Sequence, residues 1–121
     1  MEIIRKVLQG EIYTCDLWGA VGSEENKQRP CLIIQNNIGN KFSPTTVILP
    51  ISSKKNKYPF QYKLYKKDYN FFDCEENTVL CEQPRCIDKK RIIRKIGEIT
   101  KKDYEIIYKK CCEIYKKDID I

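Results

Sequence analysis

Two spacings of apolar side chains follow one another along the chain. Up to about residue 99, short segments alternate apolar with polar residues or run apolar between turn residues, as β-strands do. We predict strands over residues 11–17, 30–35, 45–52, 61–64, 78–82 and 94–99. In the first of these, alternation puts Tyr13, Cys15 and Leu17 on one face, with Ile12, Thr14 and Asp16 on the other.

After residue 99 the spacing becomes helical. Thr100 is placed to cap a helix, and Asp103 follows three residues later. Apolar residues then recur every three or four positions: Tyr104, Ile107, Tyr108, Cys111, Ile114 and Tyr115. This stripe suits either a partner protein or the helix's own sheet, and we favour the second use.

Together the two spacings predict a small, mostly β fold with α: a curled sheet or barrel with a C-terminal helix packed on it. The 121 residues fit one domain, so we assign residues 1–121 to a single unit. Residues 36–40, rich in Asn and Gly, are expected to form a turn that tolerates positive φ. Residues 19–26 read as a long polar loop suited to function.

The composition excludes several kinds of chemistry. The chain has no His, which rules out Ser-His-Asp triads, Cys-His pairs and His-ligated zinc. Its seven Cys form no C-x-x-C pair, so we expect neither a metal nor a cofactor. Most Cys lie among apolar residues and are interpreted as small core side chains of a reduced protein, with a nucleophilic Cys as the less supported alternative.

Charge is uneven along the chain. The net charge is +6, and residues 89–121 hold 11 basic and 6 acidic residues against 12 and 11 in residues 1–88. Residues 54–67 contain six Lys, four aromatic residues and no acid. Such a segment suits an RNA or DNA backbone, although a solvated lysine-rich loop would look the same. With no signal peptide and no apolar run long enough to cross a bilayer, we expect a cytoplasmic protein without membrane contact.

Polar residues gather where the predicted strands begin or end. Arg29 precedes the second strand, and Ser52 and Ser53 end the third. Glu82, Gln83 and Arg85 follow the fifth. If these strands are neighbours, Arg29, Ser52 and Gln83 converge on one rim, although each residue alone also has an ordinary structural use.

At these positions the chain resembles the MazF/PemK (Kid-like) endoribonuclease toxins, most closely their Gram-positive branch. The matching segments are G-E-I-Y at 10–13, D-L at 16–17, G-S-E at 22–24, R-P at 29–30, I-Q-N-N-I-G-N at 34–40, F-S-P-T at 42–45 and E-Q-P-R-C-I-D-K-K-R at 82–91. The resemblance implies an SH3-like β-barrel with a C-terminal helix. It also implies a homodimer, cleavage of single-stranded RNA, chiefly mRNA, and a small MazE-like antitoxin with an acidic tail.

The resemblance also assigns roles to residues. The family's catalytic Arg falls on Arg29, and its catalytic Thr falls on Ser52, which keeps the hydroxyl but lacks the methyl that restricts its rotamer. Contacts to RNA are expected from the following residues: Ser23, Glu24, Asn36, Ser53, Tyr58, Pro59, Glu82, Gln83 and Arg85. Asn37 replaces an Asp of the family pattern, which is a mild change in a turn.

This chemistry agrees with a chain that lacks His. RNA supplies its own nucleophile, the 2′-hydroxyl, and the protein has to stabilise negative charge at phosphorus, which a guanidinium does at any relevant pH. Two alternatives remain open at this point. One is a CcdB-like toxin on the same barrel that binds gyrase without cutting RNA, and the other is a basic barrel that binds RNA without cleaving it.

Overall fold

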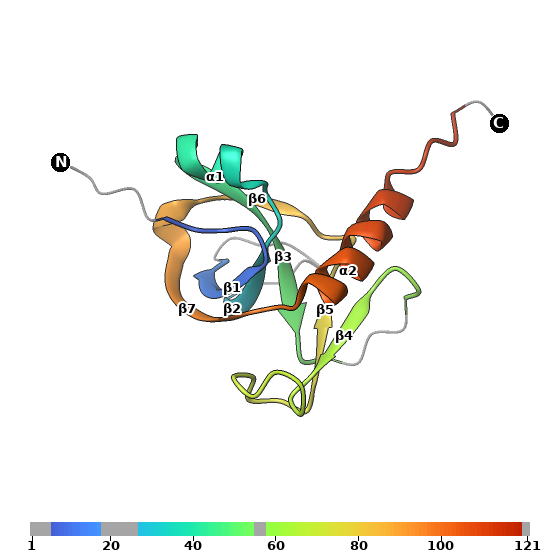
Figure 1. Ribbon diagram of the computed structural model, residues 1–121, viewed down its shortest axis with the longest axis horizontal. Helices are drawn as coiled ribbons and strands as arrows, with labels where there is room; N and C mark the ends of the chain where they lie inside the picture. The colour runs from blue at the N-terminus through green and yellow to red at the C-terminus, as the bar shows by residue number, and fades with distance from the viewer. Residues whose placement is uncertain (1–5, 18–26, 55–57, 120–121) are drawn as a thin grey trace.

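The computed structural model describes residues 6–17, 27–54 and 58–119 of the chain (Figure 1). The elements follow in this order: β1 (Glu11–Asp16), β2 (Gln28–Ile33), α1 (Asn37–Phe42), β3 (Thr45–Ser52), β4 (Tyr62–Tyr65), β5 (Glu76–Val79), β6 (Arg85–Asp88), the 3-10 turn η1 (Lys89–Arg91), β7 (Ile92–Glu98) and α2 (Lys101–Ile114). In the part of the chain described, α2 is the one long helix, as the change of spacing at Thr100 predicts.

The strands described form a curled antiparallel sheet in the order β4-β5-β3-β2-β1-β7, with β6 added beside β3. Strand β3 changes neighbours along its length. Its first half pairs with β6 and its middle with β2, whereas Ile51 and Ser52 pair with β5. The last described pair between β2 and β3 is Cys31 with Pro50, so these two strands separate before Arg29 and Ser52.

Alternation along the strands gives the sheet two buried faces. One face, here called the helix face, carries Ile12, Leu32 and Leu49, against which α2 packs with fully buried Ile107. Tyr104, Cys111 and Ile114 of α2 join this contact. The other face lies inside the curl and is here called the arginine face; its buried residues are Val7, Tyr13, Cys15, Leu17, Cys31, Ile33, Ile48, Ile87 and Ile92. The predicted division of residues 12–17 between two faces is therefore confirmed.

The first turn of α2 is held on the helix face by hydrogen bonds to one carboxylate. Thr100 Oγ1 accepts from the Asp103 amide at 3.2 Å, which is the predicted N-cap. The Tyr62 hydroxyl donates to Asp103 Oδ1 at 2.7 Å, and the Tyr69 hydroxyl donates to Asp103 Oδ2. The bond to Asp103 raises the pKa of Tyr62 to about 12, so the phenol stays protonated as a donor at neutral pH.

The structure differs from the expected elements at four points. Residues 37–42 form helix α1 instead of a positive-φ turn, because the Asn36 side chain caps it by accepting from the Gly39 amide at 2.9 Å. Strand β6 was not expected at all, and β5 spans Glu76–Val79 instead of residues 78–82. Two side chains of the predicted α2 stripe, Tyr108 and Tyr115, are exposed.

The cysteines also divide differently from the expectation. Cys15, Cys31 and Cys81 are buried core residues, and Cys111 packs against the helix-face core. The other cysteines of the chain are exposed: Cys74, Cys86 and Cys112. All seven are free thiols.

Candidate functional site

Strand register places the predicted catalytic residues on the arginine face. Arg29 lies directly opposite Cys15 in the β1–β2 pair, and opposite residues of an antiparallel pair share a face. Ser52 lies four residues after Ile48 on β3, so the same alternation turns it to that face. Arg85 pairs with Ile48 and joins them. Residues separated by up to 56 positions along the chain thus meet at one end of the curl.

The guanidinium groups of Arg29 and Arg85 both affect the pKa of the buried Cys31 thiol. A hydrogen bond with Cys15 and burial raise the pKa of Cys31 well above its usual value, and the positive charges of Arg85 and Arg29 oppose this rise. The two arginines are therefore close enough to Cys31 to share an electrostatic environment. The raised pKa keeps the thiol protonated, which argues against Cys31 as a nucleophile.

The loop that joins β1 to β2 is anchored beside these arginines. The Leu17 amide donates to the Lys27 carbonyl at 2.9 Å and closes the base of the loop. Arg85 Nη1 donates to the Leu17 carbonyl, and Arg91 Nη1 donates to the Asp16 carbonyl, each at 3.3 Å. Arg91 was not among the predicted site residues; the signal for it was its position at the end of the basic run that follows Asp88.

Ser52 is placed differently from a freely accessible hydroxyl. Its side chain is fully buried, and its Oγ accepts from the Lys54 amide at 3.1 Å. The bond fixes the turn by which the chain leaves β3. A hydroxyl can donate while it accepts, so this bond leaves the hydrogen of the Ser52 hydroxyl uncommitted.

A polar cavity of about 330 Å³ lies beside Arg29, on the helix-face side of β2. Arg29 borders it together with Ser53, the residue after Ser52. Arg94 of β7 reaches the same cavity and was not predicted from the sequence. The cavity brings together segments from β1, β2, β3, β5, β7 and the β4–β5 connection.

Glu82 and Gln83 lie in the turn that follows β5. The Gln83 amide donates to the Leu80 carbonyl at 3.0 Å, and Gln61 Nε2 donates to Glu82 Oε2 at 2.5 Å. The other carboxylate oxygen of Glu82, Oε1, and the amide oxygen of Gln61, Oε1, are buried with no hydrogen-bond donor among the described residues. Buried acceptors ordinarily have a hydrogen-bond partner, so these two oxygens are exceptions among the described residues.

Comparison with known proteins identifies the family. Residues 8–115 match the family model of the PemK-like, MazF-like toxins of type II toxin–antitoxin systems. The chain belongs to this family. It is 42% identical over 95 residues to the endoribonuclease EndoA of Bacillus subtilis (strain 168), an alignment that covers 77% of this chain and 80% of that protein.

Solved structures of lower identity share the fold. MazF of Deinococcus radiodurans (form I) superposes with a TM-score of 0.78 at 18% identity, over 92% of this chain and 97% of that one. A mycobacterial endoribonuclease in complex with its cognate antitoxin superposes with a TM-score of 0.74 at 19% identity, over 90% and 94% of the two chains. The predicted mostly β fold with a C-terminal helix is thereby confirmed. None of these relatives supports the gyrase-binding alternative.

The remaining residues expected from the MazF/PemK resemblance lie in other places. Ser23 and Glu24 fall outside the described residues, within the loop whose base Arg85 holds. Asn36 lies beyond the last residue of β2, whereas Arg29 lies near the first residue of that strand. The Asn36 side chain caps α1 there. The five residue steps from Arg29 to Ile34 alone span roughly 16 Å at about 3.3 Å each, so Asn36 does not reach Arg29 within one protomer.

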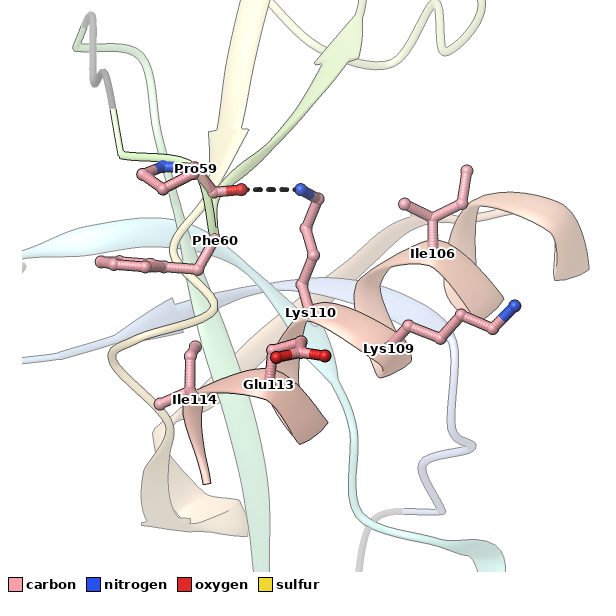
Figure 2. Close-up of a pocket in the computed structure, with 7 residues that line it drawn as sticks. All are labelled: Pro59, Phe60, Ile106, Lys109, Lys110, Glu113 and Ile114. Carbon is pink, nitrogen blue, oxygen red and sulfur yellow. Dashed lines mark hydrogen bonds between the residues drawn. The ribbon is translucent and has the colours of Figure 1, made fainter. Parts of the chain in front are cut away.

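Pro59 lies against α2, and Tyr58 precedes it on the surface. The Tyr58 and Phe60 rings stack with centroids 5.5 Å apart, and Tyr58 is 60% exposed. Figure 2 shows Lys110 reaching from α2 to the Pro59 carbonyl, a bond of 2.8 Å, beside an apolar cavity of about 460 Å³. This cavity shares no lining residue with the one that Arg29 borders.

The described residues show two further features relevant to function. They contain no group of three or more Cys, Asp or Glu arranged to hold a metal ion. Among them, no helix is long and apolar enough to cross a membrane.

Proposed function

We propose that this chain is an endoribonuclease toxin that cuts single-stranded RNA, chiefly mRNA, at defined sequences and without a metal ion. Residues 1–121 form one toxin domain in this proposal. The observation that carries it is the placement of Arg29, Ser52 and Arg85 on one face, beside the base of the loop after β1. Membership of a family with an endoribonuclease relative at 42% identity supports the same reading.

In the proposed reaction the RNA 2′-oxygen attacks the adjacent phosphorus, and the bond from phosphorus to the 5′-oxygen breaks. The 2′-hydroxyl loses its proton, the leaving 5′-oxygen gains one, and the products carry a 2′,3′-cyclic phosphate and a 5′-hydroxyl. Arg29 stabilises the extra negative charge on the phosphate oxygens, since its guanidinium offers fixed donors and stays charged. Ser52 donates to a phosphate oxygen or orients the 2′-hydroxyl. Arg29 is a poor proton donor because of its very high pKa, so its role is electrostatic.

Contacts to the bases fall to the turn after β5 in this proposal. Glu82 is half-buried there, and a carboxylate accepts hydrogen bonds from the amino or imino N–H groups of a nucleobase. Gln83 and Arg85 extend this surface toward Arg29. Asn36, at the far end of β2, joins the RNA surface only along a longer path or from a second protomer, which agrees with the proposed homodimer.

The deciding experiment incubates the purified protein with end-labelled RNA in EDTA. Discrete cuts that disappear when the nucleotide 5′ of the cut is 2′-deoxy support attack by the 2′-hydroxyl. Breaks in DNA in the presence of gyrase, with intact RNA, would instead favour the gyrase-binding alternative. Salt-sensitive RNA binding with no product at any protein concentration would favour the non-cleaving barrel.

The proposed setting is the cytoplasm, with a MazE-like antitoxin as partner. An acidic, partly disordered antitoxin tail complements a chain of net charge +6 and competes with RNA for the same surface. Antitoxin binding should therefore weaken as salt is raised. An affinity unchanged between low and high ionic strength would contradict this mode of inhibition.

A further inference from the structure

We infer that the cavity beside Arg29 binds the nucleotide next to the cleaved bond, with Arg94 holding that nucleotide's phosphate. The inference rests on the proposed RNA cleavage and adds a binding subsite to it. Three features carry it: where the cavity lies, what forms its walls, and how Arg94 is oriented.

The cavity adjoins Arg29, the proposed catalytic arginine. Arg29 borders it, and Ser53, which follows Ser52 directly, is exposed on its rim. It opens where β2 and β3 no longer pair, beyond Cys31 and Pro50. A strand of RNA with its scissile phosphate at Arg29 therefore has its next nucleotide at this opening.

The walls suit one nucleotide. The volume of about 330 Å³ lies at the lower end of the range for small-ligand pockets, which is roughly 300–1,000 Å³. Ile51 and Phe72 give it a buried apolar floor, and the half-buried Phe71 forms a side wall. An aromatic ring beside a cation is the combination that single-stranded RNA favours, because the base stacks while the phosphate is held.

The Phe71 wall is held in position by its neighbours. Its ring centroid lies 4.8 Å from that of Phe72 and 5.8 Å from that of Tyr69. The ring also lies against the backbone of β7 at Gly97, where a Cβ would come within 2.3 Å of it. Glycine at this position therefore allows the ring to lie directly on the strand.

Arg94 supplies the charge from the opposite side of the cavity. It pairs with Thr14 of β1, which in turn pairs with Pro30 of β2, so three neighbouring strands align Arg94 with the residue after Arg29. Two strand spacings of about 4.8 Å separate their backbones by roughly 10 Å, which two arginine side chains can span. The Arg94 side chain is exposed, and no described residue makes a recorded hydrogen bond or ion pair with it.

One acid shares the rim. Asp73 also lines the cavity and is exposed. Its carboxylate disfavours a bare anion but accepts hydrogen bonds from base amino groups. A nucleotide, which combines an anion with N–H donors, matches this arrangement better than free phosphate does.

The test measures binding of an RNA made uncleavable by a 2′-deoxy residue at the cut. A series of RNAs shortened one nucleotide at a time from either side of the cut is compared with the full-length RNA. Arg94→Ala should raise the Kd of the full-length RNA about tenfold and reduce the slope of log K against log salt by about 0.7. The difference from wild type should vanish once the nucleotide held in the cavity is removed. In cleavage assays the variant should raise KM and leave kcat nearly unchanged.

Lys95→Gln is the matched control. Lys95 is the next residue of β7, carries the same charge, and turns to the other face, where it pairs with Glu11 at 2.7 Å. It should bind RNA of every length like wild type, and Arg94→Lys should lie between wild type and Arg94→Ala.

Two outcomes separate this inference from the proposed function. If the wild type cuts RNA and Arg94→Ala binds every length as tightly as wild type, the subsite is wrong and the nuclease assignment stands. If the wild type cuts nothing and Arg94→Ala still weakens binding in a length-dependent way, the subsite stands and the nuclease assignment fails.

Discussion

The two faces of the curled sheet are built by the same alternating strands but serve different purposes. The helix face is closed by α2, with Ile107 fully buried among Ile12, Leu32 and Leu49. The arginine face is apolar along its middle but ends in Arg29 and Arg85 at the base of the loop after β1. One face therefore stabilises the fold and leaves the end of the other free to carry charge.

The largest expected effect is on catalysis at the arginine face. Arg29→Ala should lower the rate of RNA cleavage by roughly a hundredfold to a thousandfold, since it removes a charged donor to the phosphate. Stability to urea should change little, because the side chain is only partly buried. Single-turnover cleavage with the same RNA measures the rate. Equal cleavage by wild type and variant would remove Arg29 from the proposed mechanism.

The helix face should respond in the reverse manner. Ile107→Ala should cost about 3 kcal/mol of unfolding free energy, within the usual range of about 2–5 kcal/mol for such a cavity. Cleavage per folded molecule should stay near that of wild type. Urea unfolding followed by circular dichroism measures the loss, and Tyr108→Ala, one position along and exposed, should change stability by about 0.5 kcal/mol or less. Similar losses for the two variants would mean that α2 does not stabilise the fold through this contact.

Ser52 is expected to contribute both to catalysis and to stability. Ser52→Ala should slow cleavage roughly tenfold to a hundredfold, less than Arg29→Ala, because a neutral hydroxyl stabilises negative charge less than a guanidinium. It should also cost about 1 kcal/mol of stability, since the Lys54 amide loses its acceptor. Ser52→Thr restores the hydroxyl and separates the two effects. Full activity in Ser52→Ala would assign this residue to structure alone.

The smallest effect concerns a polar pair on the arginine face that has no role in the proposed chemistry. Burial raises the pKa of Glu11, but hydrogen bonds from Lys95, the Leu8 amide and Tyr13 outweigh it, so the pKa lies below its usual value. A lowered pKa means that this stabilisation is present above the unfolded-state value and is lost as pH falls through the folded-state value. Glu11→Gln should therefore cost about 1 kcal/mol or less at pH 7 and flatten the loss of stability in acid. Urea midpoints from pH 7 to pH 3 measure this, and an acid limb as steep as in wild type would contradict it.

Strand periodicity predicted most of the sheet, and the failures have local causes. Helix α1 contains Gly39 and two Asn, which are poor helix formers, so local propensity favoured a turn. It forms because Asn36 caps it and because buried Asn40 bonds to Thr46 at 2.7 Å and to the Gln35 carbonyl at 2.8 Å. Strand β6 has only four residues, and its partner β3 lies some 40 positions away in the chain.

The candidate site was also predicted only in part, because the local sequence does not show which distant residues meet. Arg29, Ser52 and Arg85 could be named because a motif resemblance marks them one at a time. Arg94 could not, since nothing in its immediate neighbours distinguishes it from other exposed basic residues, and Arg91 carried only the signal of its place at the end of the basic run after Asp88. Arg94 becomes significant through its pairing with Thr14, which sets it across the cavity from Arg29.

By itself, the sequence determined the kinds of element and the kind of chemistry: the two periodicities, the cap at Thr100, the lack of His, and the R-P and E-Q-P-R segments. These depend on neighbours within a few positions, which is the range over which propensity and spacing act. The tertiary structure alone decided which residues meet. It placed Arg29 and Arg85 on one face around Cys31, buried the Ser52 hydroxyl and brought Arg94 to the cavity. The physical reason is strand register, because a shift of one residue in pairing would turn every side chain of a strand to the other face.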